Sequence, residues 1–366
     1  MTIFDKRILA HFDFVQPFLA IPIIILSYIL VSEVSDTLAI RQLIYFGIGS
    51  LVFLFFFLFP IKRIQWAIPL VYWIAIILLV CVEFFGVTKM GAARWLEVPF
   101  LGLSFQPSEF MKPAFILMLG YLIMKNPPPL EGYGWIDFAK FSFYIALPSA
   151  LILKEPDLGT ALILLLAGYG VIFIVGVKRK IWITLFAIIA LSSPLLYSNL
   201  HDYQKKRISD FVSEEPSYHV KQSIIAIGNG GMSGRPKDEA TQTHFKFLPI
   251  ATSDFIFAYN SERFGFVGNF FLMSLYLLLI LHLLTLHKQI KSDYLASTVA
   301  AGVATLIFIY SSINIAMTIG LAPVVGIPLP FFSYGGSSFI TFMSLFGILQ
   351  NLITFKFRDE YKLRTD

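Results

Sequence analysis

Asp254 is the residue of this sequence whose surroundings most favour acid–base chemistry. It is followed directly by the apolar run Phe255 to Ala258, inside residues 199–265, the richest polar stretch of the chain. Partial removal of a carboxyl group from water raises its pKa, which favours a role as a general base. Alternatively, Asp254 caps a short helix beginning at Phe255, and backbone N–H groups would then lower its basicity. Glu262 lies eight residues further on, about two helical turns, so a helix would place both carboxylates on one face.

Two cations, Lys112 and Arg94, are candidates for binding an anionic group, and Glu109 is the candidate partner of Lys112. Glu109 and Lys112 are three positions apart in an apolar stretch, and on a helix this spacing lets them pair. The pair either fixes helix packing or presents Lys112 to an anionic ligand. Arg94, next to Trp95, is suited to hold a phosphate through two parallel hydrogen bonds, or else to anchor the chain at a membrane surface.

Asp157 follows the helix-breaking residue Pro156, between two apolar runs. This position predicts either an N-cap for the second run or a carboxylate that lines a cavity.

The segment from Gly320 to Ser338 has an unusual composition, with three prolines and four glycines in nineteen residues. Irregular backbone of this kind is tolerated at membrane depth only where protein or a water-filled cavity covers it. We therefore expect the segment to re-enter the membrane and to shape a pocket, with Ser333 and Ser337 among its polar groups. The alternative for Ser337 and Ser338 is that they cap the helix that follows.

The composition indicates that membrane spans position these residues. The chain has 366 residues, of which 57% are hydrophobic and 14% charged, whereas a soluble domain has about 25% charged residues. Its 38 Phe and 16 Tyr residues suit lipid-facing surfaces and interfacial belts. The single cysteine, Cys81, excludes an intrachain disulfide, and the spacing of the six histidines does not suggest a metal site.

The apolar runs predict an all-α, polytopic membrane protein with about ten transmembrane helices in a single domain over residues 1–366. A helix needs about 20 residues to cross the hydrocarbon core. The fifth and sixth runs are short and are separated by polar residues, so they form either two spans or one broken helix. The expected spans lie near residues 14–32, 39–60, 65–86, 107–125, 138–153, 159–176, 181–198, 266–286, 297–320 and 335–355.

Lysine and arginine residues are concentrated in alternate connecting segments, which predicts that both termini lie in the cytoplasm. The net charge of +5 follows from this bias and suits anionic lipid headgroups; it does not call for nucleic acid. A large loop, residues 199–265, then lies on the extracytoplasmic side between the seventh and eighth spans. Its apolar and glycine-rich patches argue against disorder over its whole length.

Taken together and in this order, the motifs resemble those of the SEDS family (shape, elongation, division and sporulation), in particular its RodA branch, through nearly the whole chain. Two departures are that Glu155 stands where glutamine is usual and Arg263 where a second acid is frequent. The motifs that carry the resemblance are Arg94-Trp95, Gln106 to Glu109 with Lys112, Pro156 to Thr160, Tyr218-His219, Gln222-Ser223, Ala226 to Gly231, Asp254 to Ala258, Gly265 to Gly268 and Gly320 to Ser338.

The resemblance implies a peptidoglycan glycosyltransferase that polymerises lipid II into β-1,4 glycan strands for cell-wall elongation. The transfer inverts the donor's α linkage, and such a reaction needs one base, for which Asp254 is the candidate. Arg94 and Lys112 would stabilise the departing pyrophosphate, and Glu109 would orient Lys112. The other residues that the resemblance brings forward for substrate binding are Asp157, Gln222, Ser223, Glu262, Ser333 and Ser337.

The resemblance also implies an inner-membrane location with the active site on the extracytoplasmic side. A class B penicillin-binding protein and other elongation-complex membrane proteins would be the partners. No cofactor is evident, although a divalent cation on the substrate pyrophosphate is compatible with the chemistry. Two other functions stay open, a lipid II flippase and a non-catalytic scaffold of the elongation complex. The candidate residues cluster on the outer side, which disfavours a flippase, and a scaffold leaves the apolar setting of Asp254 unexplained.

Overall fold

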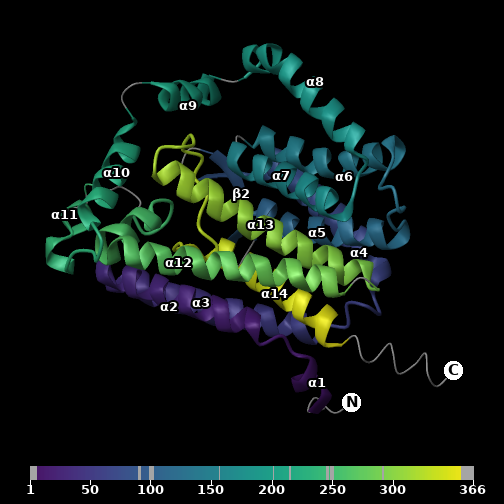
Figure 1. Cartoon of the computed structure of the whole chain (residues 1–366), viewed down its shortest axis with the longest axis horizontal. Coiled ribbons are helices and arrows are strands. Elements are labelled where there is room, and N and C mark those ends of the chain that lie inside the picture. Colours follow the sequence, from purple (N-terminus) through teal and green to yellow (C-terminus); the bar gives the residue numbers. More distant parts are fainter. Residues whose placement is uncertain are drawn as a thin grey trace.

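The computed structural model describes residues 6–89, 92–98, 103–155, 157–200, 202–213, 216–244, 247, 251–290 and 292–355. Long helices dominate this part of the chain, and each of the predicted spans falls on one of them (Figure 1). These helices are α2 (Val15–Val34), α3 (Asp36–Leu58), α4 (Ile68–Phe85), α5 (Pro107–Lys125), α6 (Trp135–Lys154), α7 (Leu158–Val175), α8 (Arg179–Ser198), α12 (Ile256–Gln289), α13 (Tyr294–Thr318) and α14 (Gly336–Thr354).

Eight of the long helices within the described residues are long and apolar enough to cross a membrane, and α5 and α8 are the two that fall outside this group. The first turn of α5 carries Glu109 and Lys112, which lowers its apolar character. The fold is therefore all-α and polytopic, as the sequence predicts.

The buried centre of the bundle contains α5 and α13, which pack against each other and against α7 and α14. In α13, 72% of the most apolar stretch is buried, whereas in α3 only 17% is buried. A helix that is hydrophobic all round has either a protein or a lipid environment on every side. The outer helices accordingly expose large apolar side chains, such as Phe18 of α2 and Leu51 of α3.

The runs on either side of Asp157 form two separate helices, α6 and α7, which pack against each other. This arrangement confirms a pair of spans instead of one broken helix. The predicted helix breaker, Pro156, lies outside the described residues.

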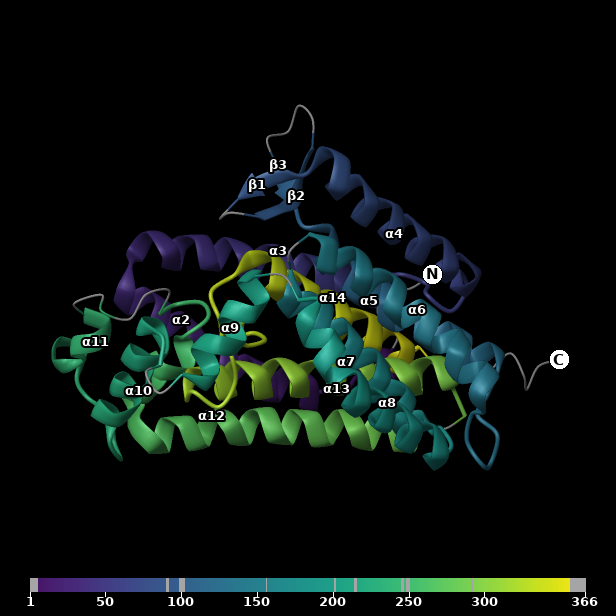
Figure 2. The ribbon, with the colours of Figure 1, turned by 90° about the horizontal axis from the view of Figure 1, so that it is seen from above.

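A small antiparallel sheet stands beside α4 and was not anticipated from the sequence (Figure 2). Its strands are β1 (Val87–Lys89), β2 (Ala92–Val98) and β3 (Leu103–Phe105), with β2 in the middle. Trp95 pairs with Val87 on one side and Leu96 pairs with Phe105 on the other. Arg94 is thus carried by the central strand of a sheet that also packs on α5.

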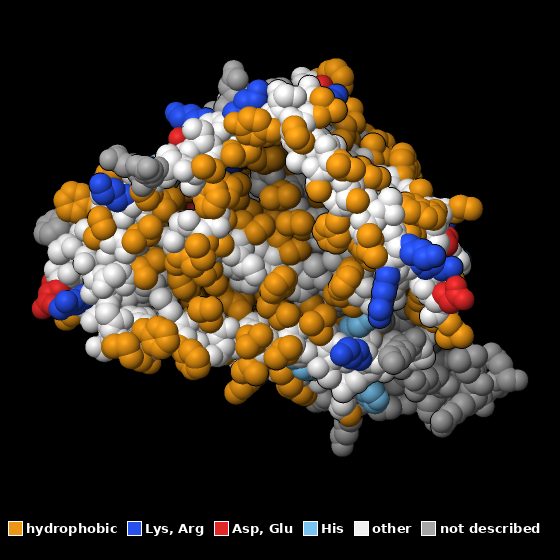
Figure 3. All heavy atoms as spheres, turned by 45° about the horizontal axis from the view of Figure 1, so that its top comes forward, with side chains coloured by type: hydrophobic (Ala, Val, Ile, Leu, Met, Phe, Trp, Pro, Cys, Tyr) orange, Lys and Arg blue, Asp and Glu red, His pale blue; other side chains and the backbone are white. Residues whose placement is uncertain are grey.

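The predicted large loop contains helices through much of its described length, so the expectation that it is not wholly disordered is confirmed. Helix α9 (Asp202–Val212), the first helix of this loop, forms an arch over the bundle together with α8 (Figure 1). Figure 3 shows that the surface beneath the arch is hollowed and lined with hydrophobic side chains. An apolar groove of about 630 Å³ lies between α7, α12 and α13. The short elements are α1 (Lys6–His11), η1 (Gln65–Ala67), α9 (Asp202–Val212), α10 (Tyr218–Gly230), η2 (Lys237–Glu239) and α11 (Thr241–His244).

The eighth predicted span, residues 266–286, lies in the part of α12 that follows a kink, and α12 itself begins ten residues earlier, at Ile256. The helix kinks at Gly265, whose φ of 62° is readily adopted only by glycine. At the kink, the N–H of Phe266 donates to the carbonyl of Gly231 at 2.9 Å, and that of Val267 donates to Met232 at 3.1 Å. The glycine-rich end of α10 therefore fastens the large loop onto α12, which a hydropathy pattern does not show.

Candidate active site

Asp254 lies in a turn over residues 251–255, immediately before α12. The N-cap of α12 is Phe255, and no side-chain hydrogen bond caps this helix end. The alternative that Asp254 caps a helix beginning at Phe255 is therefore wrong. Burial raises the pKa of the Asp254 carboxyl above its ordinary value, and a hydrogen bond with the Ser253 side chain offsets part of that rise.

The proline- and glycine-rich segment after α13 holds the Asp254 turn in place. The side-chain amide of Asn314, on α13, donates to the backbone carbonyl of Asp254 at 2.9 Å and to that of Ile327 at 2.6 Å. The hydroxyl of Ser333 donates to the carbonyl of Ser253 at 2.6 Å. Ser333 therefore fixes the backbone next to Asp254, a role compatible with its predicted place in the pocket.

Gly326 of this segment lies next to the Asp254 carboxylate. A Cβ atom at Gly326 would lie 3.5 Å from Oδ2 of Asp254, so the carboxylate faces this segment. The φ angle of Gly326 is 70°, in the left-handed region that favours glycine. The irregular segment thus lies against the Asp254 carboxylate, a contact that the sequence did not indicate.

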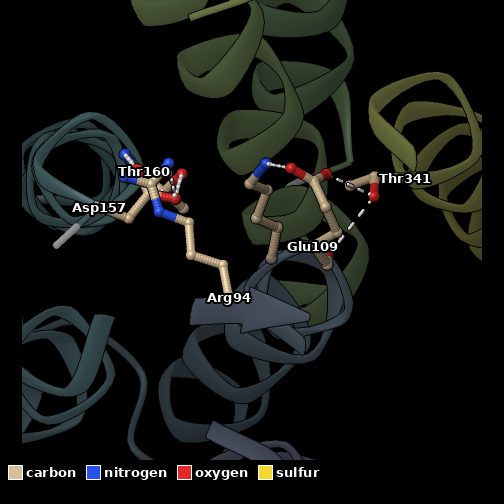
Figure 4. A network of polar contacts seen from close by, with 6 residues as sticks. Arg94, Glu109, Asp157, Thr160 and Thr341 are labelled. Carbon is tan, nitrogen blue, oxygen red and sulfur yellow. Dashed lines mark hydrogen bonds and ion pairs between the residues drawn. The ribbon is translucent and has the colours of Figure 1, made fainter. Parts of the chain in front are cut away.

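Arg94 joins β2 to the connection between α6 and α7. Its Nε donates to the backbone carbonyl of Glu155 at 3.3 Å, and its terminal nitrogen lies 3.7 Å from Oδ2 of Asp157. Asp157 also caps α7, because its Oδ1 accepts from the N–H of Thr160 at 3.1 Å. Figure 4 shows Arg94 extended toward Asp157 and Thr160. The predicted N-cap is confirmed, and the same carboxylate also faces Arg94.

Glu109 and Lys112 form an ion pair of 2.5 Å near the start of α5. The other carboxylate oxygen of Glu109 accepts from the hydroxyl of Thr341, on α14, at 2.9 Å (Figure 4). The side chain of Lys112 is only 1% exposed, and its ammonium lies 5.1 Å from the ring centre of Tyr310. In this conformation the pair links α5, α13 and α14, which supports the packing interpretation.

The remaining candidates lie at different places around the large loop. Ser223 is fully buried on α10, and its hydroxyl donates to the carbonyl of Thr318 at 2.7 Å. Glu262 is also buried, and its Oε1 accepts from the backbone N–H of Gln242 at 2.9 Å. Gln222 is half-buried on the same helix as Ser223. The structure thus gives Ser223 and Glu262 packing contacts, and their predicted contact with substrate stays a prediction.

Ser337 and Ser338 belong to the first turn of α14, where both are half-buried. The N-cap of this helix is Gly335, and no side-chain hydrogen bond is made there. The expectation that either serine caps the helix is therefore wrong, because the helix begins one residue before Ser337.

Two contacts that hold Asp254 and the first turns of α12 were missed in the sequence. Asn314 is a polar residue inside an apolar helix, and this pattern was the available signal. Arg263 forms a two-point ion pair with Glu33 of α2, at 2.6 and 2.7 Å, just after the Asp254 turn. Because Glu33 and Arg263 are 230 positions apart, no local sequence pattern could predict this ion pair. Among the described residues, no group of three or more His, Cys, Asp or Glu side chains is placed to hold a metal ion.

Comparison with known proteins covers nearly the whole chain. Residues 6–357 match the model of the family described as cell cycle protein, FtsW/RodA/SpoVE. The peptidoglycan glycosyltransferase MrdB of Helicobacter pylori is 54% identical over 96% of this chain and 93% of its own length. MrdB of Escherichia coli is 38% identical over 79% of this chain and 78% of its own length.

Two solved structures share the fold. One belongs to a peptidoglycan synthase complex that coordinates polymerization and crosslinking; it has a TM-score of 0.81, is 26% identical, and the match covers 96% of this chain and 99% of that one. The other is the rod shape determining protein RodA of Thermus thermophilus, with a TM-score of 0.69 and 25% identity over 96% of this chain and 98% of that one.

Proposed function

Because the chain belongs to the FtsW/RodA/SpoVE family of cell cycle proteins, we propose that it polymerises lipid II by an inverting transfer in which Asp254 is the general base. The chain is a peptidoglycan glycosyltransferase and a multi-pass inner-membrane protein. Its lipid-linked substrate and the roles of its residues are the proposed part.

In the proposed reaction, the 4-hydroxyl of the acceptor sugar attacks the anomeric carbon of the donor. Asp254 takes the hydroxyl proton as the new C–O bond forms. The old bond between the anomeric carbon and the pyrophosphate oxygen breaks, and its electron pair leaves with the pyrophosphate. One displacement inverts the α-linked donor to a β-1,4 product.

The observation that carries this proposal is the setting of Asp254. Its carboxylate faces the irregular segment at Gly326, and burial raises its pKa, which makes it a better base than an exposed aspartate. A guanidinium is a good partner for the pyrophosphate that leaves, and Arg94 is the candidate for this role. Lys112 is the weaker candidate, since Glu109 and Tyr310 cover its ammonium.

The location and partners of the site are also part of the proposal. The bias of Lys and Arg supports cytoplasmic termini and an extracytoplasmic site. The similarity to a chain of a peptidoglycan synthase complex supports a crosslinking partner, a class B penicillin-binding protein, together with other elongation-complex membrane proteins. A divalent cation on the substrate pyrophosphate would neutralise part of its charge.

The test is polymerisation of fluorescent lipid II by purified wild type, Asp254→Asn and Asp238→Asn, each with the cognate transpeptidase. Asp238 is a matched control, because it is an exposed aspartate of the same large loop. We expect polymer from the wild type and the control, and a loss of at least about 100-fold for Asp254→Asn, the size of a general-base contribution. Monodisperse elution of each variant checks that it is folded.

Polymer from a folded Asp254→Asn variant would exclude Asp254 as the base while leaving the enzyme in place. A wild type that makes no polymer with the transpeptidase present would favour a flippase or a scaffold. Transport of lipid II across vesicle membranes would then separate those two functions.

A further inference from the structure

Glu155 is a buried carboxyl group that the mechanism above does not use. Its side chain is 5% exposed, and neither carboxyl oxygen has a hydrogen-bond partner among the described residues. A buried acid without a partner is costly, because it loses the hydrogen bonds that water supplies. A buried carboxyl group of this kind lowers the stability of the fold, and its presence therefore indicates a functional role.

Its position in the fold disfavours a negative charge. Glu155 is the C-cap of α6, where the partial negative charge of the helix end opposes an anion. Asp157, two residues further on at the start of α7, adds a second like charge. Burial, the largest cause, and the charge of Asp157 raise the pKa of Glu155 to about 8, although Arg94 acts in the opposite direction.

The other charged groups near this end of α6 do not compensate Glu155. Lys154 is 66% exposed and lies 3.8 Å from Glu83 of α4, which is 50% exposed. The cation that acts on Glu155 is Arg94, on β2, which also faces Asp157. Around neutral pH, Glu155 is therefore mainly a carboxylic acid, and a carboxylic acid carries one O–H donor.

We propose that Glu155 is a further substrate-binding residue, which donates the O–H of its neutral carboxylic acid to the anionic phosphate group that Arg94 holds. This proposal rests on the proposed function for the identity of that group, the pyrophosphate of the lipid-linked donor. Arg94 connects the two, because its Nε already bonds to the backbone of Glu155. An ionised Glu155 would instead repel the pyrophosphate, so proton loss weakens donor binding.

The first experiment needs no substrate. The unfolded chain ionises Glu155 above its ordinary pKa of 4.5, whereas the folded protein keeps it neutral to about 8. Folding thus holds one extra proton in this window, so stability falls as pH rises from about 4.5 to about 8. Thermal unfolding of wild type and Glu155→Gln should therefore diverge across this window, with the variant several degrees more stable at pH 8.

The second experiment follows polymerisation of fluorescent lipid II from pH 6 to pH 10, as kcat and KM. For the wild type we expect kcat/KM to fall about tenfold per pH unit above about pH 8, mainly through KM, as one proton is lost. Glu155→Gln keeps a neutral donor and should remain active without this fall, whereas Glu155→Leu should raise KM below about pH 8 and should also lack the alkaline fall. Glu83→Gln, an exposed carboxylate near Lys154, is the control and should follow the wild type.

A stability difference between wild type and Glu155→Gln that does not change between pH 5 and pH 8 would overturn the neutral acid. An alkaline fall that persists in Glu155→Gln, or an unchanged KM in a folded Glu155→Leu, would overturn the donor role. Retained activity of Asp254→Asn would instead overturn the proposed base, and it would leave both results for Glu155 standing.

Discussion

At the scale of single residues, the site depends on how Asp254 is held. Its carboxylate does not cap α12, so capping hydrogen bonds from backbone N–H groups do not lower its basicity. Asn314 and Ser333 bond to the backbone of the Asp254 turn and leave the carboxylate itself to face Gly326. A base held by its backbone keeps its position while its side chain exchanges a proton.

Gly326 should therefore be sensitive to the smallest substitution. In Gly326→Ala, the methyl group would enter a backbone conformation that L residues avoid, at a cost of about 1–2 kcal/mol, and would contact the Asp254 carboxylate. We expect kcat to fall by about tenfold or more, which corresponds to about 1.4 kcal/mol in the barrier.

Gly228→Ala is the matched control, since a Cβ at Gly228 meets no atom within 4 Å and the residue lies inside α10. Steady-state lipid II polymerisation by the two variants makes the comparison. Equal activity of Gly326→Ala and Gly228→Ala would show that the segment does not touch the reacting group.

At the scale of elements, an ion pair between α2 and α12 holds the first turns of α12, which directly follow the turn that carries Asp254. Arg263 forms two bonds to Glu33, and Tyr259 adds a third, with its hydroxyl donating to the same carboxylate at 2.8 Å. Both charged side chains are more than four-fifths buried, at 13% and 16% exposure. The first turns of α12 are thus fixed between α2 and the large loop.

Breaking this pair should loosen the site without touching it. Arg263→Gln leaves the Glu33 carboxylate largely buried without its guanidinium partner, which costs about 3 kcal/mol of stability and should lower kcat more than it raises KM. Arg263→Lys keeps the charge but loses the two-point geometry, so it should recover only part of the activity.

The exchanged pair, Glu33→Arg with Arg263→Glu, tests the coupling. A double-mutant cycle in thermal stability and in kcat should give a favourable interaction energy between the two positions. Additive effects of the single and double changes would mean that the two residues act separately.

Some parts of this structure were predictable from the sequence, and others were not. The spans were predictable because twenty apolar residues in a row have few alternatives to a membrane helix. Asp157 as an N-cap was also predictable, since its contact is with Thr160, three positions away. The small sheet, the kink at Gly265 and the contact from Glu33 to Arg263 were not, because each depends on segments brought together only by folding.

At the scale of the whole molecule, orientation in the membrane decides which compartment supplies the substrate. The described part of the chain places the glycine-rich end of the large loop at the kinked, N-terminal end of α12. The basic residue Lys288 lies at the other end of the same helix. The part of α12 after the kink, from Phe266 to Gln289, has 24 residues and is about 36 Å long, enough to place its ends in different compartments.

Labelling of single introduced cysteines measures this orientation. Cys81 is the single cysteine of the chain, so Cys81→Ala gives a cysteine-free protein for the experiment. In that background, Asp238→Cys in intact cells with a permeabilised outer membrane should react with a membrane-impermeant maleimide. Lys288→Cys should react only after the inner membrane is opened, and both positions are exposed on the protein. The opposite pattern would place Asp254 on the cytoplasmic side, where an enzyme of this orientation would have to add sugars before the lipid-linked precursor crosses the membrane.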